Sequence, residues 1–177
     1  AKKEGAYLIR KLGIGREPVA VFAGRKMITP AYFLGVVYAG RPYAPIDASL
    51  PDKRIEKILE NLMPRAIVAD RESLGHVSEI VAELSKDQNF VAPEIFVAEE
   101  VCSTDTENKE DEELLATVRK QMSMTDPLYI IYTSGSTGNP KGVMTSHLSL
   151  MTYINAYCGV MQIERDDVLG NQSPLDY

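Results

Sequence analysis

Apolar residues recur along the chain in two alternating patterns, short continuous runs and helical spacing. The continuous runs lie at residues 19–22, 43–46, 66–69, 95–97 and 128–132, of which the last is the bulkiest. Runs of this length are typical of strands buried on both faces of a parallel sheet. Between the runs, apolar residues three or four positions apart predict helices.

The predicted helices carry start and stop signals. Gly13 ends the first helix and Gly40 the second. Thr29 and Pro30 begin the second with a capping hydroxyl and a proline at the first helical position. This helix is apolar nearly all round, which predicts burial. Apolar spacing predicts further helices at residues 55–62, 77–84, 114–122 and 150–157. Ser146 is expected to cap the last of these helices.

Strands alternating with helices predict an α/β fold with a mostly parallel sheet flanked by helices. Pro45 lies in the second strand and predicts an edge position or an irregular ladder there. The 177 residues suit a single unit with a buried core. Cys102 and Cys158 form no ligand pattern, and we expect both to be reduced thiols in a cytoplasmic protein.

The charge is concentrated in one stretch. Residues 99–113 hold eight acids and one lysine, so the rest of the chain is near neutral although the whole has a net charge of −6. We expect a solvated acidic loop at about 99–113, because like charges repel at this density. The near-neutral remainder predicts no nucleic-acid partner. No apolar run is long enough to predict a membrane span.

Candidate chemistry follows the last predicted strand directly. Residues 132–142 combine four serine and threonine hydroxyls, three glycines and Lys141. Glycines expose backbone amides, and amides and hydroxyls aimed inward form an anion site. A lysine adds a mobile positive charge. Such a loop at the carboxyl end of a parallel strand predicts a polyphosphate site.

Other interpretations of this segment are a plain surface loop, a Walker loop and a dinucleotide fingerprint. In a plain surface loop, nothing requires a buried strand, a high density of hydroxyls and a lysine to occur together. A Walker loop needs Gly-Lys followed by Ser or Thr, whereas here Lys141 precedes Gly142 and Val143 follows. The glycines do not fall as Gly-x-Gly-x-x-Gly either.

The segment resembles the signature loop of the adenylate-forming (AMP-binding) enzymes, which reads Thr-Ser-Gly-Ser/Thr-Thr-Gly-x-Pro-Lys-Gly. Residues 133–142 fit it at every fixed position, and His147 lies where many members have a histidine. Residues 38–47 with Arg54-Ile55 are similar to a segment of the amino-acid-activating branch. Residues 171–174 are similar to a stretch of D-alanine–carrier protein ligases.

This resemblance implies that residues 1–177 are one subdomain of a large N-terminal domain, in an N-terminal fragment that lacks the C-terminal domain. It also implies an ATP-dependent ligase that forms an acyl-adenylate from a small carboxylate, favouring an amino acid. The acyl group would then pass to the phosphopantetheine thiol of a carrier protein. The Mg²⁺ ligand would lie outside the fragment, and the fragment alone would be inactive.

The resemblance also implies which residues hold the ATP phosphates, with Lys141 in addition catalytic. The phosphate-binding residues would be Thr133, Ser134, Gly135, Ser136, Thr137, Gly138 and Lys141.

Three further residues and two other functions stay open. His147 is either near the substrate or a helix-start histidine bonded to backbone. Asp47 is expected to shape a turn, and Asp176 lies near where amino-acid activators place an acid. The loop alone equally permits an acyl-CoA or aryl-CoA ligase. The chain by itself is alternatively a non-catalytic nucleotide-binding fragment.

Overall fold

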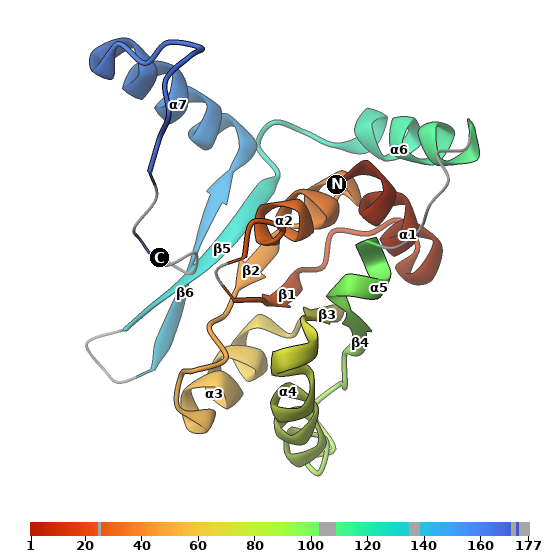
Figure 1. Ribbon diagram of the computed structural model, residues 1–177. Coiled ribbons are helices and arrows are strands. Elements are labelled where there is room, and N and C mark those ends of the chain that lie inside the picture. The colour runs from red at the N-terminus through yellow and green to blue at the C-terminus, as the bar shows by residue number, and fades with distance from the viewer. Residues whose placement is uncertain (25, 103–108, 135–138, 171–172, 174–177) are drawn as a thin grey trace.

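One mixed, mostly parallel sheet organises the chain (Figure 1). The computed structural model describes residues 1–177 apart from 25, 103–108, 135–138, 171–172 and 174–177. Within the described residues, six strands run in the order β4-β3-β1-β2-β5-β6. All neighbours are parallel except β5 and β6, which are antiparallel. The strands are β1 (Val19–Phe22), β2 (Tyr43–Pro45), β3 (Ala66–Ala69), β4 (Glu94–Val97), β5 (Pro127–Ser134) and β6 (Pro140–Ser146).

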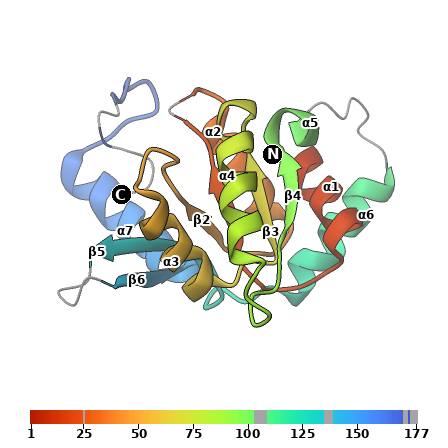
Figure 2. The same cartoon turned by 90° about the horizontal axis from the view of Figure 1, so that it is seen from below.

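Helices cover both faces of the parallel part of the sheet. The connections from β2 to β3 and from β3 to β4 place α3 and α4 together on one face (Figure 2). The helices α1, α2, α5 and α6 pack on the other face. The helices are α1 (Lys2–Leu12), α2 (Thr29–Tyr38), α3 (Asp52–Leu62), α4 (Arg71–Leu84), α5 (Ala98–Cys102), α6 (Lys109–Gln121) and α7 (His147–Met161).

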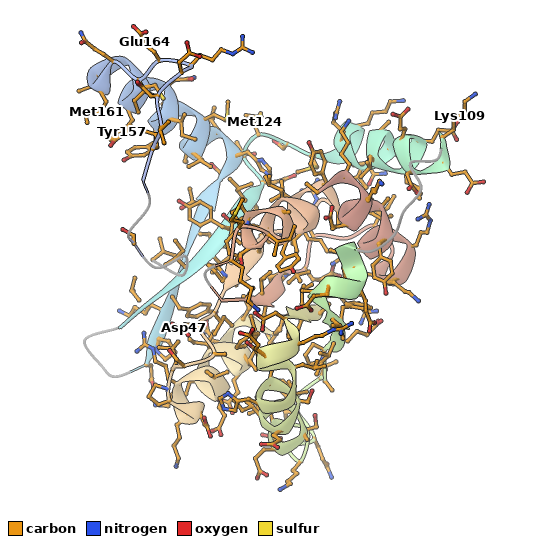
Figure 3. All side chains as sticks on the ribbon, viewed as in Figure 1. Asp47, Lys109, Met124, Tyr157, Met161 and Glu164 are labelled. Atoms are coloured by element: carbon orange, nitrogen blue, oxygen red, sulfur yellow. The ribbon has the colours of Figure 1, made fainter. Side chains whose placement is uncertain are left out.

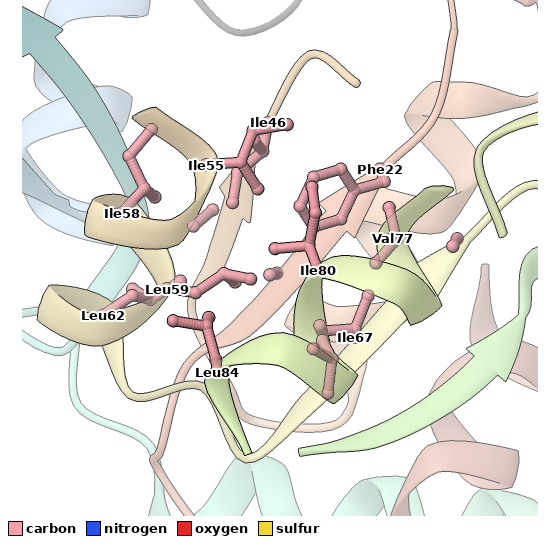
Figure 4. Packing of buried hydrophobic residues seen from close by; sticks show 14 of the residues in the cluster. Phe22, Ile46, Ile55, Ile58, Leu59, Leu62, Ile67, Val77, Ile80 and Leu84 are labelled. Carbon is pink, nitrogen blue, oxygen red and sulfur yellow. The ribbon is translucent and has the colours of Figure 1, made fainter. Parts of the chain in front are cut away.

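The core beneath α3 and α4 joins these two helices to the strands (Figure 4). Phe22 and Ile67 reach it from β1 and β3, and Ile55, Leu59 and Val77 meet them from the two helices. All five are fully buried. Burying a large apolar side chain contributes roughly 1.5–3 kcal/mol, so this layer fixes α3 firmly against the sheet.

The predicted helix signals are confirmed in part. Gly13 follows α1 with a φ of 73°, and Gly40 follows α2 with a φ of 78°, both in the left-handed region that favours glycine. Helix α2 begins at Thr29, but the Thr29 hydroxyl does not cap it. Instead, this hydroxyl donates to the Gly24 carbonyl oxygen at 2.6 Å. Burial of α2 is also less complete than its sequence predicts, because Leu34 is exposed.

The acidic loop expected at about 99–113 is wrong at both ends. Glu99 and Glu100 lie in α5, and α6 already begins at Lys109. Three acids lie in the first turn of α6, where the helix dipole favours negative charge. Asp111 among them is buried and accepts a hydrogen bond from Arg10 of α1. Residues 103–108 lie outside the described residues.

Strands β2 and β6 differ from the sequence patterns. Strand β2 lies inside the sheet, between β1 and β5, so the edge alternative for Pro45 is wrong. Its ladder to β5 is nonetheless reduced to one pair, Tyr43 with Tyr129. Strand β6 was not predicted, because its side chains are mostly exposed and carry no continuous apolar run.

Candidate functional site

The two ends of the glycine-rich segment lie side by side on the β5–β6 hairpin. Thr133 on β5 pairs with Lys141 on β6, and Ser134 pairs with Pro140. Residues directly opposite in an antiparallel pair project from the same face. Thr133 and Lys141 are both exposed, and Lys141 forms no ion pair with any described residue. The hairpin therefore presents a hydroxyl and a cation together.

The opposite face of the hairpin rests on α3. Tyr132 pairs with Gly142, and alternation places it on the other face from Thr133. The Tyr132 hydroxyl donates to Asn61 Oδ1 at 2.8 Å. Burial raises the pKa of Tyr132 to about 12, so this hydroxyl keeps its proton at neutral pH.

A second contact joins α3 to the start of β6. Lys57 Nζ donates to Asn139 Oδ1 at 3.1 Å. A cavity of about 380 Å³ lies between α3 and the hairpin, lined by Lys57, Glu60, Asn61, Asn139 and Pro140. The lining is mainly polar and carries both signs of charge.

The helix that follows the hairpin begins with the predicted cap. Ser146 Oγ accepts from the Ser149 amide at 3.2 Å, which confirms Ser146 as the N-cap of α7. The His147 amide donates to the Asp126 carbonyl oxygen at 3.2 Å. Burial lowers the pKa of His147, and the Asp126 carboxylate opposes that shift. His147 is thus held at the helix start, with the neutral imidazole favoured.

Asp47 shapes a turn, as predicted. Its Oδ1 accepts from the Ser49 amide at 2.8 Å, and the Leu50 amide donates to its carbonyl oxygen at 3.2 Å. This is the geometry of an Asx turn. Asp47 therefore forms a turn in the segment that connects β2 to α3 (Figure 3).

Several expected site residues fall outside the described part of the chain. These are Gly135, Ser136, Thr137, Gly138 and Asp176. Among the residues that the structure describes, no three His, Cys, Asp or Glu side chains are grouped to hold a metal ion. Likewise, no described helix has the length and apolar character needed to cross a bilayer.

The sequence did not single out Asn61, Lys57 or Asn139. Spacing of one turn places Lys57 and Asn61 on one side of α3. Nothing local indicates that this side faces a hairpin about 80 residues further along the chain. The signal that was available is a helix with two hydrogen-bonding side chains one turn apart beside its buried face.

The fold and the family match identify a known class of protein. The model of the AMP-binding enzyme family matches residues 1–176, and the chain belongs to that family.

Two curated relatives show to which members of the family this chain is similar. The chain is 33% identical over 162 residues to the D-alanine–D-alanyl carrier protein ligase of Bacillus velezensis, covering 92% of this chain and 29% of that protein. It is 34% identical over 142 residues to the ligase of the same name from Lactiplantibacillus plantarum, covering 79% of this chain and 24% of that protein. The chain thus spans less than a third of the length of these curated relatives.

Solved structures show the same fold. ATP-bound MatB from Rhodopseudomonas palustris superposes with a TM-score of 0.72 at 20% identity, covering 99% of this chain and 34% of that one. A four-domain nonribosomal peptide synthetase bound to AMP and glycine superposes with a TM-score of 0.62 at 24% identity, covering 92% of this chain and 10% of that one.

Proposed function

We propose that the protein carrying this chain uses ATP to activate a small carboxylate, an amino acid, as an acyl-adenylate. The acyl group then passes to the phosphopantetheine thiol of a carrier protein. Membership of the AMP-binding enzymes and relatives named as D-alanyl carrier protein ligases support this proposal. Because the chain spans less than a third of those relatives, we expect the 177 residues alone to be inactive.

One observation carries the proposal: the pairing of Thr133 with Lys141 on the exposed face of the hairpin. A cation on a flexible stem and a hydroxyl on the neighbouring strand suit a group of phosphate oxygens. Ser134, Gly135, Ser136, Thr137 and Gly138 would add the hydroxyls and backbone amides that their residue types supply.

The proposed reaction is an in-line displacement at the α-phosphorus of ATP. A carboxylate oxygen attacks the phosphorus, and the bond to the bridging oxygen of pyrophosphate breaks with its electron pair. Negative charge therefore grows on the departing pyrophosphate. Lys141 and Thr133 lower the barrier by holding the β- and γ-phosphates and stabilising that charge.

Mg²⁺ accompanies ATP in this proposal, as a counter-charge for the phosphates. No metal-holding group of side chains is present among the described residues. We therefore assign its protein ligand to no residue described here.

The test is ATP–pyrophosphate exchange by the full-length protein across a panel of amino acids and fatty acids. We expect exchange with an amino acid, and we expect Lys141→Ala to reduce it about 100-fold, in the range for losing one group that stabilises transition-state charge. Because Lys141 is exposed, the thermal midpoint should stay unchanged.

The matched control is Lys120→Ala, which removes an exposed lysine from α6, at the opposite end of the sheet from the β5–β6 hairpin (Figure 2). Unchanged exchange in Lys141→Ala would remove this lysine from the mechanism. Exchange with fatty acids or aryl acids alone would instead support a CoA ligase.

A further inference from the structure

Helix α3 contacts both strands of the hairpin. Asn61 accepts the Tyr132 hydroxyl of β5 at 2.8 Å, and Lys57 donates to Asn139 beside β6 at 3.1 Å. The two helix residues are four positions apart, so they lie one turn apart on one side of α3. We call these two hydrogen bonds the tie. They connect a single helix, α3, to β5 and to the start of β6.

The contact extends across the hairpin through Tyr132. A Cβ placed on Gly142 would lie 3.1 Å from Tyr132 Cζ and 3.0 Å from Ile130 Cγ2. Gly142 thus leaves the space that the Tyr132 ring occupies. A side chain at position 142 would push this ring, and with it the hydroxyl that reaches Asn61.

The sheet itself holds the far end of the hairpin weakly. Strand β5 pairs with β2 only at Tyr129, so the residues beyond it have no ladder on that side. The paired ends of β5 and β6 extend past β2 in Figure 1. By contrast, α3 is anchored by Ile55, Ile58 and Leu59, all buried.

We propose that Asn61, Lys57 and Tyr132 are positioning residues that tie the hairpin to α3 and thereby set where Thr133 and Lys141 meet the ATP phosphates. This rests on the proposed function. Tyr132 is adjacent to Thr133, and Gly142 is adjacent to Lys141, so a shift of the tied face moves both phosphate-facing side chains. The face carrying Thr133 and Lys141 stays open because α3 occupies the other one.

The test uses the full-length protein with Asn61→Ala, Tyr132→Phe, the double variant and Asn61→Asp. We expect each of the first two to lower kcat/KM for ATP in pyrophosphate exchange about 3- to 10-fold, the range for one hydrogen bond. The effect should fall mainly on KM for ATP, and the double variant should resemble a single one because both remove the same bond. Asn61→Asp keeps an acceptor oxygen and should restore most of the loss.

Lys53→Ala is the matched control, an exposed residue one turn before Lys57 on the same helix. It should keep wild-type kinetics, and the other variants should unfold within a few degrees of it, because each loses at most one hydrogen bond. A second readout does not depend on activity: hydrogen exchange of the 128–134 and 141–146 amides should be faster in Asn61→Ala than in Lys53→Ala.

The outcomes separate this inference from the proposed function. Wild-type kinetics or unchanged hydrogen exchange in Asn61→Ala and Tyr132→Phe, with Lys141→Ala impaired, would overturn the positioning role alone. Faster hydrogen exchange in Asn61→Ala, in a protein that supports no ATP–pyrophosphate exchange, would support the contact between α3 and the hairpin and overturn the proposed adenylation reaction.

Discussion

Asp70 is the residue that joins the carboxyl ends of β1 and β3. It is 1% exposed, and its carboxylate accepts from the Ser73 amide at 3.0 Å and from the Gly24 amide at 3.1 Å. Lys26 Nζ lies 3.1 Å from the same carboxylate. One side chain thus caps α4 and holds the segment after β1.

These contacts give Asp70 a pH-dependent contribution to stability. Burial raises the pKa of Asp70, but the hydrogen bonds from Ser73 and Gly24 and the Lys26 ammonium outweigh it, and the net shift is downward. The contribution is therefore complete above the unfolded pKa of about 4 and is lost as the pH falls through the lower folded pKa.

Replacing Asp70 tests this contribution. We expect Asp70→Ala to lower the free energy of unfolding by about 2 kcal/mol at pH 7, because it removes a helix cap and leaves a buried amide unpaired. The difference from wild type should shrink as the pH falls below about 4. Urea unfolding at several pH values measures it, with the exposed loop residue Asp87→Ala as control. A difference that is constant down to pH 2 would contradict the account.

At the residue scale, the sequence predicted the roles of those residues whose hydrogen-bond partners lie close to them in the chain. Asp47 and Ser146 each bond an amide two or three positions away, and turn and cap signals depend only on such neighbours. Asn61 and Tyr132 are 71 positions apart. Only the folded sheet brings such a pair together.

At the scale of elements, the hydrophobic pattern predicted those strands that are buried in the sheet. Strands β1 and β3 are buried at every position, and their continuous apolar runs identify them. Strand β6 has a largely exposed face and carries glycine and lysine, so its partner β5 rather than its own pattern makes it a strand. The acidic stretch was predicted to be a loop because its like charges repel. That prediction was wrong, since the dipole of α6 favours acids in its first turn and Arg10 pairs with one of them, Asp111.

At the scale of the whole molecule, α7 is the element that packs least. None of its described residues is buried, and Tyr157 and Met161 lie on it away from the helices that cover the sheet (Figure 3). The exposed apolar side chains of α7 are Leu148, Met151, Tyr153, Ile154, Tyr157, Val160 and Met161. Exposed apolar side chains gathered on one helix promote association.

This surface predicts how the 177-residue chain behaves alone. We expect it to self-associate and to bind the dye ANS, and we expect Ile154→Glu with Tyr157→Glu to reduce both. The substitution should cost less than about 0.5 kcal/mol of stability, because exposed positions contribute little. Light scattering and ANS fluorescence measure the effect, with Glu164→Gln beyond α7 as control. A monomeric chain that binds no dye would show that the α7 surface is covered.

The fold class could be predicted from the sequence as a whole, because alternation of strands and helices restricts the topology. The mostly parallel sheet is confirmed. The placement of α7 and the joining of α3 to the hairpin could not be predicted, since both depend on long-range packing.

The most direct test of the central claim is a structure of the full-length protein with Mg²⁺ and a non-hydrolysable ATP analogue. The account predicts the β- and γ-phosphates against the face of the hairpin that carries Thr133, with Lys141 Nζ in hydrogen-bonding distance of a phosphate oxygen. A triphosphate bound elsewhere, with Lys141 turned to solvent, would contradict it.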